Sequence, residues 1–85
     1  VIGNKANQIF AFPNPFESST QLVFPSSYEQ FDIAIYDMYG KLILSQKGIS
    51  SPTYQLVNEN LSSGVYWLRV VNHTDINPLK LIVHN

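Results

Sequence analysis

The side chains that could do chemistry in this 85-residue chain are few and lie far apart in the sequence. A serine nucleophile needs a base and an orienting acid, and the serines here fall in predicted turns without a Gly-x-Ser-x-Gly elbow. The four glycines are too sparse for a phosphate-binding loop. The carboxylates fall in different loops and strand ends, so no acid/base pair is indicated: Glu17, Glu29, Asp32, Asp37, Glu59 and Asp75. The sequence therefore predicts no catalytic residues and a protein that is not an enzyme.

Residues that could bind a metal or take part in redox chemistry are also few. The chain has no cysteine, which excludes disulfide frameworks, thiolate zinc sites and cysteine nucleophiles. Its two histidines, His73 and His84, lack ligand spacing. The least unlikely metal is calcium, at an oxygen-rich loop that could equally be an ordinary turn: Asn72, Thr74, Asp75 and Asn77. We expect no metal site and no cofactor.

Aromatic and charged residues restrict the classes of partner. Aromatic side chains could form a sugar-stacking surface, but their spread over different strands favours packing in the core and turns: Tyr28, Tyr36, Tyr39, Tyr54, Tyr66 and Trp67. The net charge is −1, and the five Lys and Arg residues are spread singly. No basic stripe could neutralise a row of phosphates, so we expect no nucleic-acid partner.

The elements that must position these residues are predicted to be strands. Short runs of Val, Ile, Phe and Tyr alternate with clusters of Gly, Pro, Asn and Ser, a rhythm typical of a β-sandwich. The chain is long enough for one modest core. We predict an all-β, immunoglobulin-like sandwich of about seven strands: Ile9–Phe12, Thr20–Phe24, Phe31–Asp37, Lys41–Gln46, Thr53–Val57, Val65–Asn72 and Leu79–His84.

Alternation predicts which faces are buried. Phe31, Ile33 and Ile35 share the face expected to point inward. In the run from Val65 to Val71 both faces are mostly apolar, which indicates a central strand. We predict three inward side chains, Tyr66, Leu68 and Val70, and four outward ones, Val65, Trp67, Arg69 and Val71.

The organisation of the chain is that of one domain preceded by a linker. Residues 1–8 are polar and unpatterned, and we expect them to join an upstream cargo domain to a domain of residues 9–85. The chain begins Val1-Ile2-Gly3, has no signal peptide, and has no apolar run near the roughly 20 residues that span a bilayer. We therefore expect it to be a piece of a longer protein.

Four segments carry a family resemblance by their order and spacing: Phe12-Pro13-Asn14-Pro15-Phe16, Ile35-Tyr36-Asp37-Met38-Tyr39-Gly40-Lys41, Leu61-Ser62-Ser63-Gly64-Val65-Tyr66 and Leu79-Lys80-Leu81-Ile82-Val83. Over residues 9–84 the chain resembles the type A C-terminal sorting domain of the type IX (Por) secretion system. The resemblance implies a secretion signal that takes an attached cargo through the periplasm and across the outer membrane, to the cell surface or the medium. It also implies recognition by translocon and shuttle proteins, and removal by a sortase-like peptidase that cuts within residues 1–8 or just upstream.

Each motif residue also has a structural interpretation. Pro13 and Pro15 stiffen a bend in which Asn14 bonds its own neighbours. We expect Asp37 to bond turn amides before Lys41, Gly40 to take a positive φ, and Gly64 to give the backbone freedom from which Tyr66 begins a core strand. Lys80 and Val83 belong to the final strand, where Lys80 and the carboxylate of Asn85 can be exposed. The ending His84-Asn85 departs from the further Lys or Arg common in the family.

Two other interpretations remain open. An accessory immunoglobulin-like or carbohydrate-binding module of a secreted protein would stay attached to its neighbour, whereas a sorting domain is removed. A structural spacer would tolerate loss of the end of the last strand without stopping export. Exposed edge strands could also pair with a second copy of the chain to give a homodimer.

Overall fold

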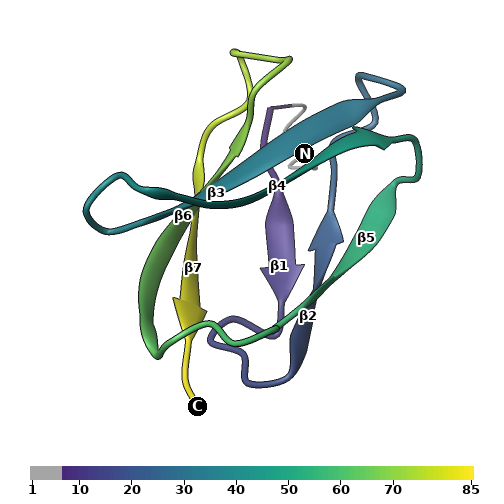
Figure 1. The fold of residues 1–85 in the computed structure, drawn as a ribbon. Helices are drawn as coiled ribbons and strands as arrows, with labels where there is room; N and C mark the ends of the chain where they lie inside the picture. Colours follow the sequence, from purple (N-terminus) through teal and green to yellow (C-terminus); the bar gives the residue numbers. More distant parts are fainter. Residues whose placement is uncertain (1–6) are drawn as a thin grey trace.

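The computed structural model describes residues 7–85, and their seven strands form two antiparallel sheets. One sheet has the order β1-β2-β5, from β1 (Phe10–Phe12), β2 (Ser19–Val23) and β5 (Thr53–Val57). The other has the order β4-β3-β6-β7 (Figure 1), from β4 (Leu42–Ile49), β3 (Phe31–Asp37), β6 (Gly64–Val70) and β7 (Leu79–Val83). The predicted β-sandwich is confirmed. β4 pairs with β3, so the sheet that contains β1 has three strands and the sheet that contains β3 has four. In immunoglobulin constant domains the fourth strand belongs to the first sheet, so the corresponding sheets have four and three strands.

Most predicted strand bounds lie within two residues of the observed ones, and β4 is the exception. It runs to Ile49, although the sequence predicts an end at Gln46. The pairing of β3 with β4 shifts register twice, so extra residues bulge from β4. The backbone N–H of Gly48 donates to Oδ1 of Asp32 at 2.8 Å, and Ile49 then pairs with Phe31. A bulge held by a side chain of the neighbouring strand therefore continues a strand that local turn residues predict to stop.

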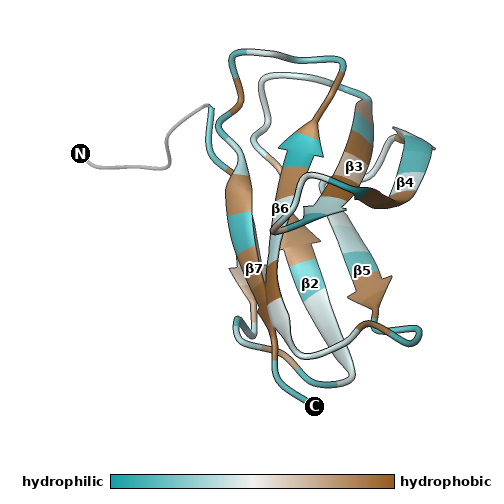
Figure 2. Cartoon of the chain, turned by 60° about the vertical axis from the view of Figure 1, so that its left-hand side comes forward, coloured by the Kyte–Doolittle hydropathy of each residue, from teal (hydrophilic) through white to brown (hydrophobic). Residues whose placement is uncertain are grey.

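The core lies between the two sheets. Phe31, Ile33 and Ile35 of β3 are buried, as predicted. In β6 the predicted alternation also holds, since its three predicted inward side chains are buried while Trp67 and Arg69 are exposed. Hydrophobic and hydrophilic bands accordingly succeed one another along the strands (Figure 2). Residues outside the strands complete the core, including Ile9, Phe16 and Ile76.

The chain enters and leaves the sandwich at opposite ends. β1 and β7 run in the same direction (Figure 1), and the isolated pairing of Phe16 with Val83 is parallel. The backbone N–H of Asn77, just before β7, donates to the carbonyl of Asn7 at 3.1 Å. The start of the domain therefore lies beside the start of β7, one strand length from Asn85.

Candidate functional site

The four sequence segments come together at one end of the four-stranded sheet. β3 ends, β6 begins and β7 ends there, since Asp37 pairs with Tyr66, Tyr66 with Leu81 and Gly64 with Val83. The segment between β1 and β2 lies against the outer edge of β7. We call this region the motif end and define it as Pro13–Phe16, Asp37–Lys41, Gly64–Tyr66 and Lys80–Val83.

Asn14 seals the free edge of β7. Its Nδ2 donates to the carbonyl of Lys80 at 2.9 Å, and its Oδ1 accepts the backbone N–H of Ile82 at 2.9 Å. Two main-chain bonds continue the seal: Phe16 N–H donates to Ile82 O, and His84 N–H donates to Phe16 O, both at 2.9 Å. The expectation that Asn14 bonds its own neighbours is wrong. A side-chain amide has the donor and acceptor of a peptide group, so it can pair with a strand edge that would otherwise be exposed.

The Pro13–Phe16 bend directs its aromatic neighbours in opposite ways. Phe16 is 2% exposed and belongs to the core, whereas Phe12 is 59% exposed. The carbonyl of Pro13 accepts a 2.7 Å hydrogen bond from Oγ1 of Thr20, a threonine that is 1% exposed. Pro13 and Pro15 are themselves exposed. The bend therefore both anchors Phe16 and presents two proline rings to solvent.

Asp37 forms the β3–β4 turn, as predicted. Its Oδ1 accepts the backbone N–H groups of Tyr39 and Lys41, each at 2.9 Å. The main chain closes the turn, because Gly40 N–H donates to Asp37 O and Asp37 N–H to Lys41 O, both at 3.0 Å. Gly40 has the predicted positive φ, 85°. Oδ1 of Asp37 is thus an acceptor for turn amides.

Tyr66 anchors the start of β6. Its hydroxyl donates to the carbonyl of Ser62 at 2.7 Å, while its ring is buried. This is the tyrosine corner of immunoglobulin-like folds, in which a tyrosine near the start of a strand bonds the backbone a few residues upstream. Gly64, two residues earlier, has φ 154°. The sequence predicted the inward ring of Tyr66 but missed the hydroxyl bond, for which the Ser-Ser-Gly turn before a tyrosine was the available signal.

An asparagine pair fastens the chain after β7. Nδ2 of Asn85 donates to Leu61 O at 2.7 Å, and its backbone N–H donates to Oγ of Ser63 at 2.9 Å. Nδ2 of Asn58 contacts both Oδ1 of Asn85 at 2.9 Å and the carbonyl of Glu17 at 2.8 Å. Residue 85 is therefore held against the β5–β6 loop, which Asn58 in turn joins to Glu17. No local sequence pattern signalled this network.

The predicted recognition residues divide into two groups. Asn14, Asp37, Gly40, Gly64, Tyr66 and Val83 make the bonds, turns or core contacts that build the motif end. Pro13, Pro15, Lys41 and Lys80 are exposed. The second group is the part of the predicted set that a partner could contact without disturbing the fold.

The oxygen-rich loop before β7 is occupied by protein contacts. Both carboxylate oxygens of Asp75 accept the hydroxyl of Tyr28, at 2.8 and 2.9 Å. Oδ1 of Asn72 accepts the backbone N–H of Asp32 at 2.9 Å. Within residues 7–85, no group of three or more His, Asp or Glu side chains is placed to hold a metal ion. Asn72 and Asp75 therefore join this loop to the β2–β3 connection and to the start of β3.

Tyr28 and His73 tie this loop to the β2–β3 connection. Their rings stack with centroids 3.6 Å apart, and Nε2 of His73 lies 2.7 Å from the carbonyl of Gln30. The hydrogen bond that the Tyr28 hydroxyl donates to Asp75 raises the pKa of that hydroxyl, with smaller contributions from desolvation and the charge of Asp75. The cluster fixes the end of the sandwich opposite the motif end.

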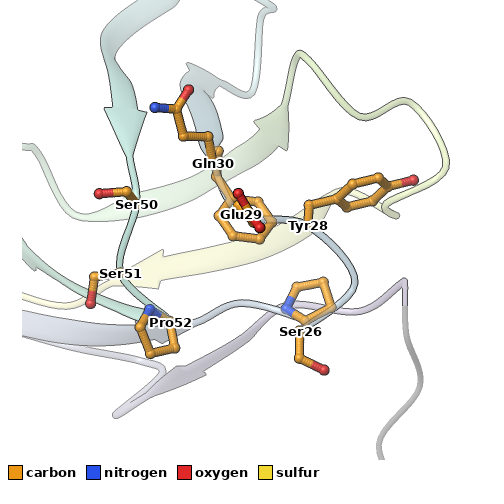
Figure 3. A pocket seen from close by; sticks show the side chains of 9 residues that line it. Ser26, Tyr28, Glu29, Gln30, Ser50, Ser51 and Pro52 are labelled. Atoms are coloured by element: carbon orange, nitrogen blue, oxygen red, sulfur yellow. The ribbon is translucent and has the colours of Figure 1, made fainter.

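A surface hollow of about 600 Å³ lies beside this cluster, between the segments around Tyr28 and Ser51 (Figure 3). The Tyr28 hydroxyl points away from the Ser50–Pro52 side (Figure 3). Glu29 is the one carboxylate among the described residues that line it. A nucleophile with its base and acid is not assembled there.

The arrangement defines a class of protein: a small immunoglobulin-like β-sandwich whose distinctive residues build one strand-sealed end. Residues 10–84 match the family model described as the secretion system C-terminal sorting domain (Por secretion tail). The chain belongs to this family. No curated protein and no solved structure matched the chain.

Membership gives the function in outline. The domain is a non-catalytic signal for secretion of an attached cargo through the type IX (Por) system. A sorting domain interacts with the secretion machinery. Within residues 7–85, no helix has the length and apolar character needed to cross a membrane.

Proposed function

We propose that translocon and shuttle proteins of the type IX system recognise this domain in its folded state, at the motif end. The observation that carries the proposal is the convergence of all four family segments on that end. Six of the predicted recognition residues serve to build it, which supports recognition of the folded shape. The signal is a surface that requires a complete sandwich.

The position of the cargo supports the same proposal. The start of the domain lies at the opposite end, beside Asn77. A cargo attached upstream therefore leaves the motif end accessible. In transit through the periplasm, the machinery can hold the motif end while the cargo trails, before the cargo reaches the cell surface or the medium.

Removal of the domain would take place before the first strand. A peptidase requires an accessible, extended backbone, and the first buried side chain among the described residues is that of Ile9, which is 4% exposed. We place the cut of a sortase-like peptidase within residues 1–8 or just upstream of them. After such a cut the folded domain separates from its cargo as one piece.

The test is to fuse residues 1–85 to a secreted reporter and to measure the mass of the reporter recovered outside a type IX-competent bacterium. We expect the recovered reporter to have lost residues 9–85. In a strain that lacks the peptidase, the reporter should retain them. Replacing Asn14 by alanine should lower export, while Asn77→Ala, at an exposed residue beside the start of the domain and away from the motif end, should not. Export of an unfolded or strand-deleted tag at the level of the intact one would contradict recognition of the folded domain.

Pairing with a second copy is restricted to certain edges. β1, β5 and β4 lie at the edges of their sheets, whereas the edge of β7 is occupied by Asn14 and Phe16. A homodimer would therefore form through β1, β4 or β5. Light scattering at micromolar concentration tests this prediction, and a protein that is monomeric at all concentrations would contradict the homodimer.

A further inference from the structure

The outer face of the four-stranded sheet carries a row of large side chains that nothing covers within residues 7–85. The register places Leu42, Tyr36, Trp67 and Lys80 side by side across β4, β3, β6 and β7. Leu42 is 51% exposed and Trp67 is 42% exposed. Arg69, two residues from Trp67, points to the same face. We call these five residues the outer row.

The chemistry of the outer row is that of a protein interface. Trp, Tyr, Arg and Met are enriched at the centres of protein interfaces, where a few such residues supply most of the binding energy. A hollow of about 380 Å³ lies at the middle of the row, with Tyr36, Trp67 and Arg69 among its lining. Met38, which is 64% exposed, also lines it. A hollow of this kind accepts an anchoring side chain of a partner.

Charge indicates what kind of partner fits. The cations of the described residues lie in the four-stranded sheet or next to it: Lys41, Lys47, Arg69 and Lys80. Four carboxylates lie outside that sheet, in loops: Glu17, Glu29, Glu59 and Asp75. Asp32 and Asp37, which do belong to it, accept backbone N–H groups of the chain itself. The outer row therefore presents Trp67 between two cations, Arg69 and Lys80.

The outer row also continues into the motif end. Lys80 belongs to both, and the Asp37–Lys41 turn borders the hollow. The exposed motif residues and the outer row thus form one continuous surface. A partner bound at the motif end would extend over Trp67.

We propose that the outer row is a docking surface for an acidic protein surface of the secretion machinery, with Trp67 as its apolar anchor and Arg69 and Lys80 as its charge partners. This inference rests on the proposed function. The motif residues build the end of the sandwich, and the outer row supplies the contacts. The acidic partner pairs its carboxylates with Arg69 and Lys80 and places an apolar side chain against Trp67.

The test compares three variants of the tag on the same secreted reporter. Arg69→Glu with Lys80→Glu reverses the charge of the outer row, and Trp67→Ala removes its anchor. Lys47→Glu is the matched control, since Lys47 is an exposed cation on β4 outside the row. Thermal melts of the purified tags establish that each variant is folded. We expect the first two variants to reduce export about tenfold or more, with a folded tag in the periplasm, and the control to be exported normally.

Binding of the purified tag to the purified translocon with its shuttle protein tests the charge of the partner. We expect binding to weaken as salt rises from about 0.05 M to about 0.5 M, and to be lost on charge reversal. Binding that is insensitive to salt and to charge reversal overturns the acidic partner. A dimer of the tag that disappears in Trp67→Ala, or retention on a glycan column that disappears in that variant, shows another occupant and overturns the proposal.

The two levels of the argument fail differently. If the unaltered tag does not direct export, the proposed function is wrong. If the unaltered tag directs export and the folded charge-reversal variant does so equally well, the sorting role stands and the docking surface is wrong.

Discussion

Replacing Asn14 with alanine tests the seal on the edge of β7. The change removes two hydrogen bonds, the one donated to Lys80 O and the one accepted from Ile82 N–H, both 2.9 Å long. Both lie at an exposed site, so water partly replaces them. At about 0.5–1 kcal/mol for each bond, the free energy of unfolding should fall by about 1–2 kcal/mol. For a domain of this size that lowers Tm by about 5–15 °C.

Hydrogen exchange locates the effect. The Ile82 amide loses its acceptor in Asn14→Ala, so its exchange should accelerate by about 5–30-fold, the factor that corresponds to 1–2 kcal/mol. Denaturant unfolding followed by fluorescence of Trp67 gives the global free energy. Asn77→Ala is the control, since Asn77 is exposed and its bond to Asn7 is made by its backbone N–H. An Asn14→Ala protein with unchanged stability and unchanged Ile82 exchange would refute the seal.

Three further changes test the local geometry. Tyr66→Phe removes the 2.7 Å bond to Ser62 O and should lower the free energy of unfolding by about 1–2 kcal/mol, measured in urea. Gly40→Ala meets no atom within 4 Å, so its loss of about 1–2 kcal/mol in thermal melts should come from the positive φ alone. The raised pKa of Tyr28 means that the fold favours the neutral phenol. This stabilisation should be complete below pH 10.0, the ordinary pKa of a tyrosine, and should be lost as the pH rises through the folded-state pKa. In Asp75→Asn it should be largely absent, because the hydrogen bond to the Asp75 carboxylate is its main cause.

Controls for these changes are available in the same chain. Tyr39→Phe, at a side chain 88% exposed, should leave stability unchanged where Tyr66→Phe lowers it. Gly40→Asn should be milder than Gly40→Ala, because asparagine tolerates a positive φ better. In an absorbance titration, the Tyr28→Phe protein should lack the tyrosine whose raised pKa is seen in the unaltered protein. Equal losses in Tyr39→Phe and Tyr66→Phe would contradict the tyrosine corner.

The strands and their buried faces were predictable because the signals are local. In β6, inward and outward side chains alternate with period two, and Tyr66, Leu68 and Val70 are buried as predicted. The Asp37 turn was predictable for the same reason, since an aspartate and a glycine three residues apart suffice to define it. Each of these features depends on residues that are neighbours in sequence.

The contacts that join the motif end were not predictable in this way. Asn14 bonds residues 66 and 68 positions away, and Asn58 bonds Asn85 at a separation of 27. An asparagine amide can pair with almost any polar group, so its residue type does not identify its partner. The predicted end of β4, at Gln46, was also wrong, because the carboxylate of Asp32 holds a bulge at Gly48 and the strand continues to Ile49. Long-range pairing is decided by the assembled sheets.

The most direct test of the sorting role is to follow a reporter fused to residues 1–85, with an N-terminal export signal, in strains with and without a working type IX system. The account predicts reporter outside the cell only when the system works, and without the sandwich domain on the mature product. Reporter retained in the periplasm of both strains, with the folded domain still attached, would contradict it.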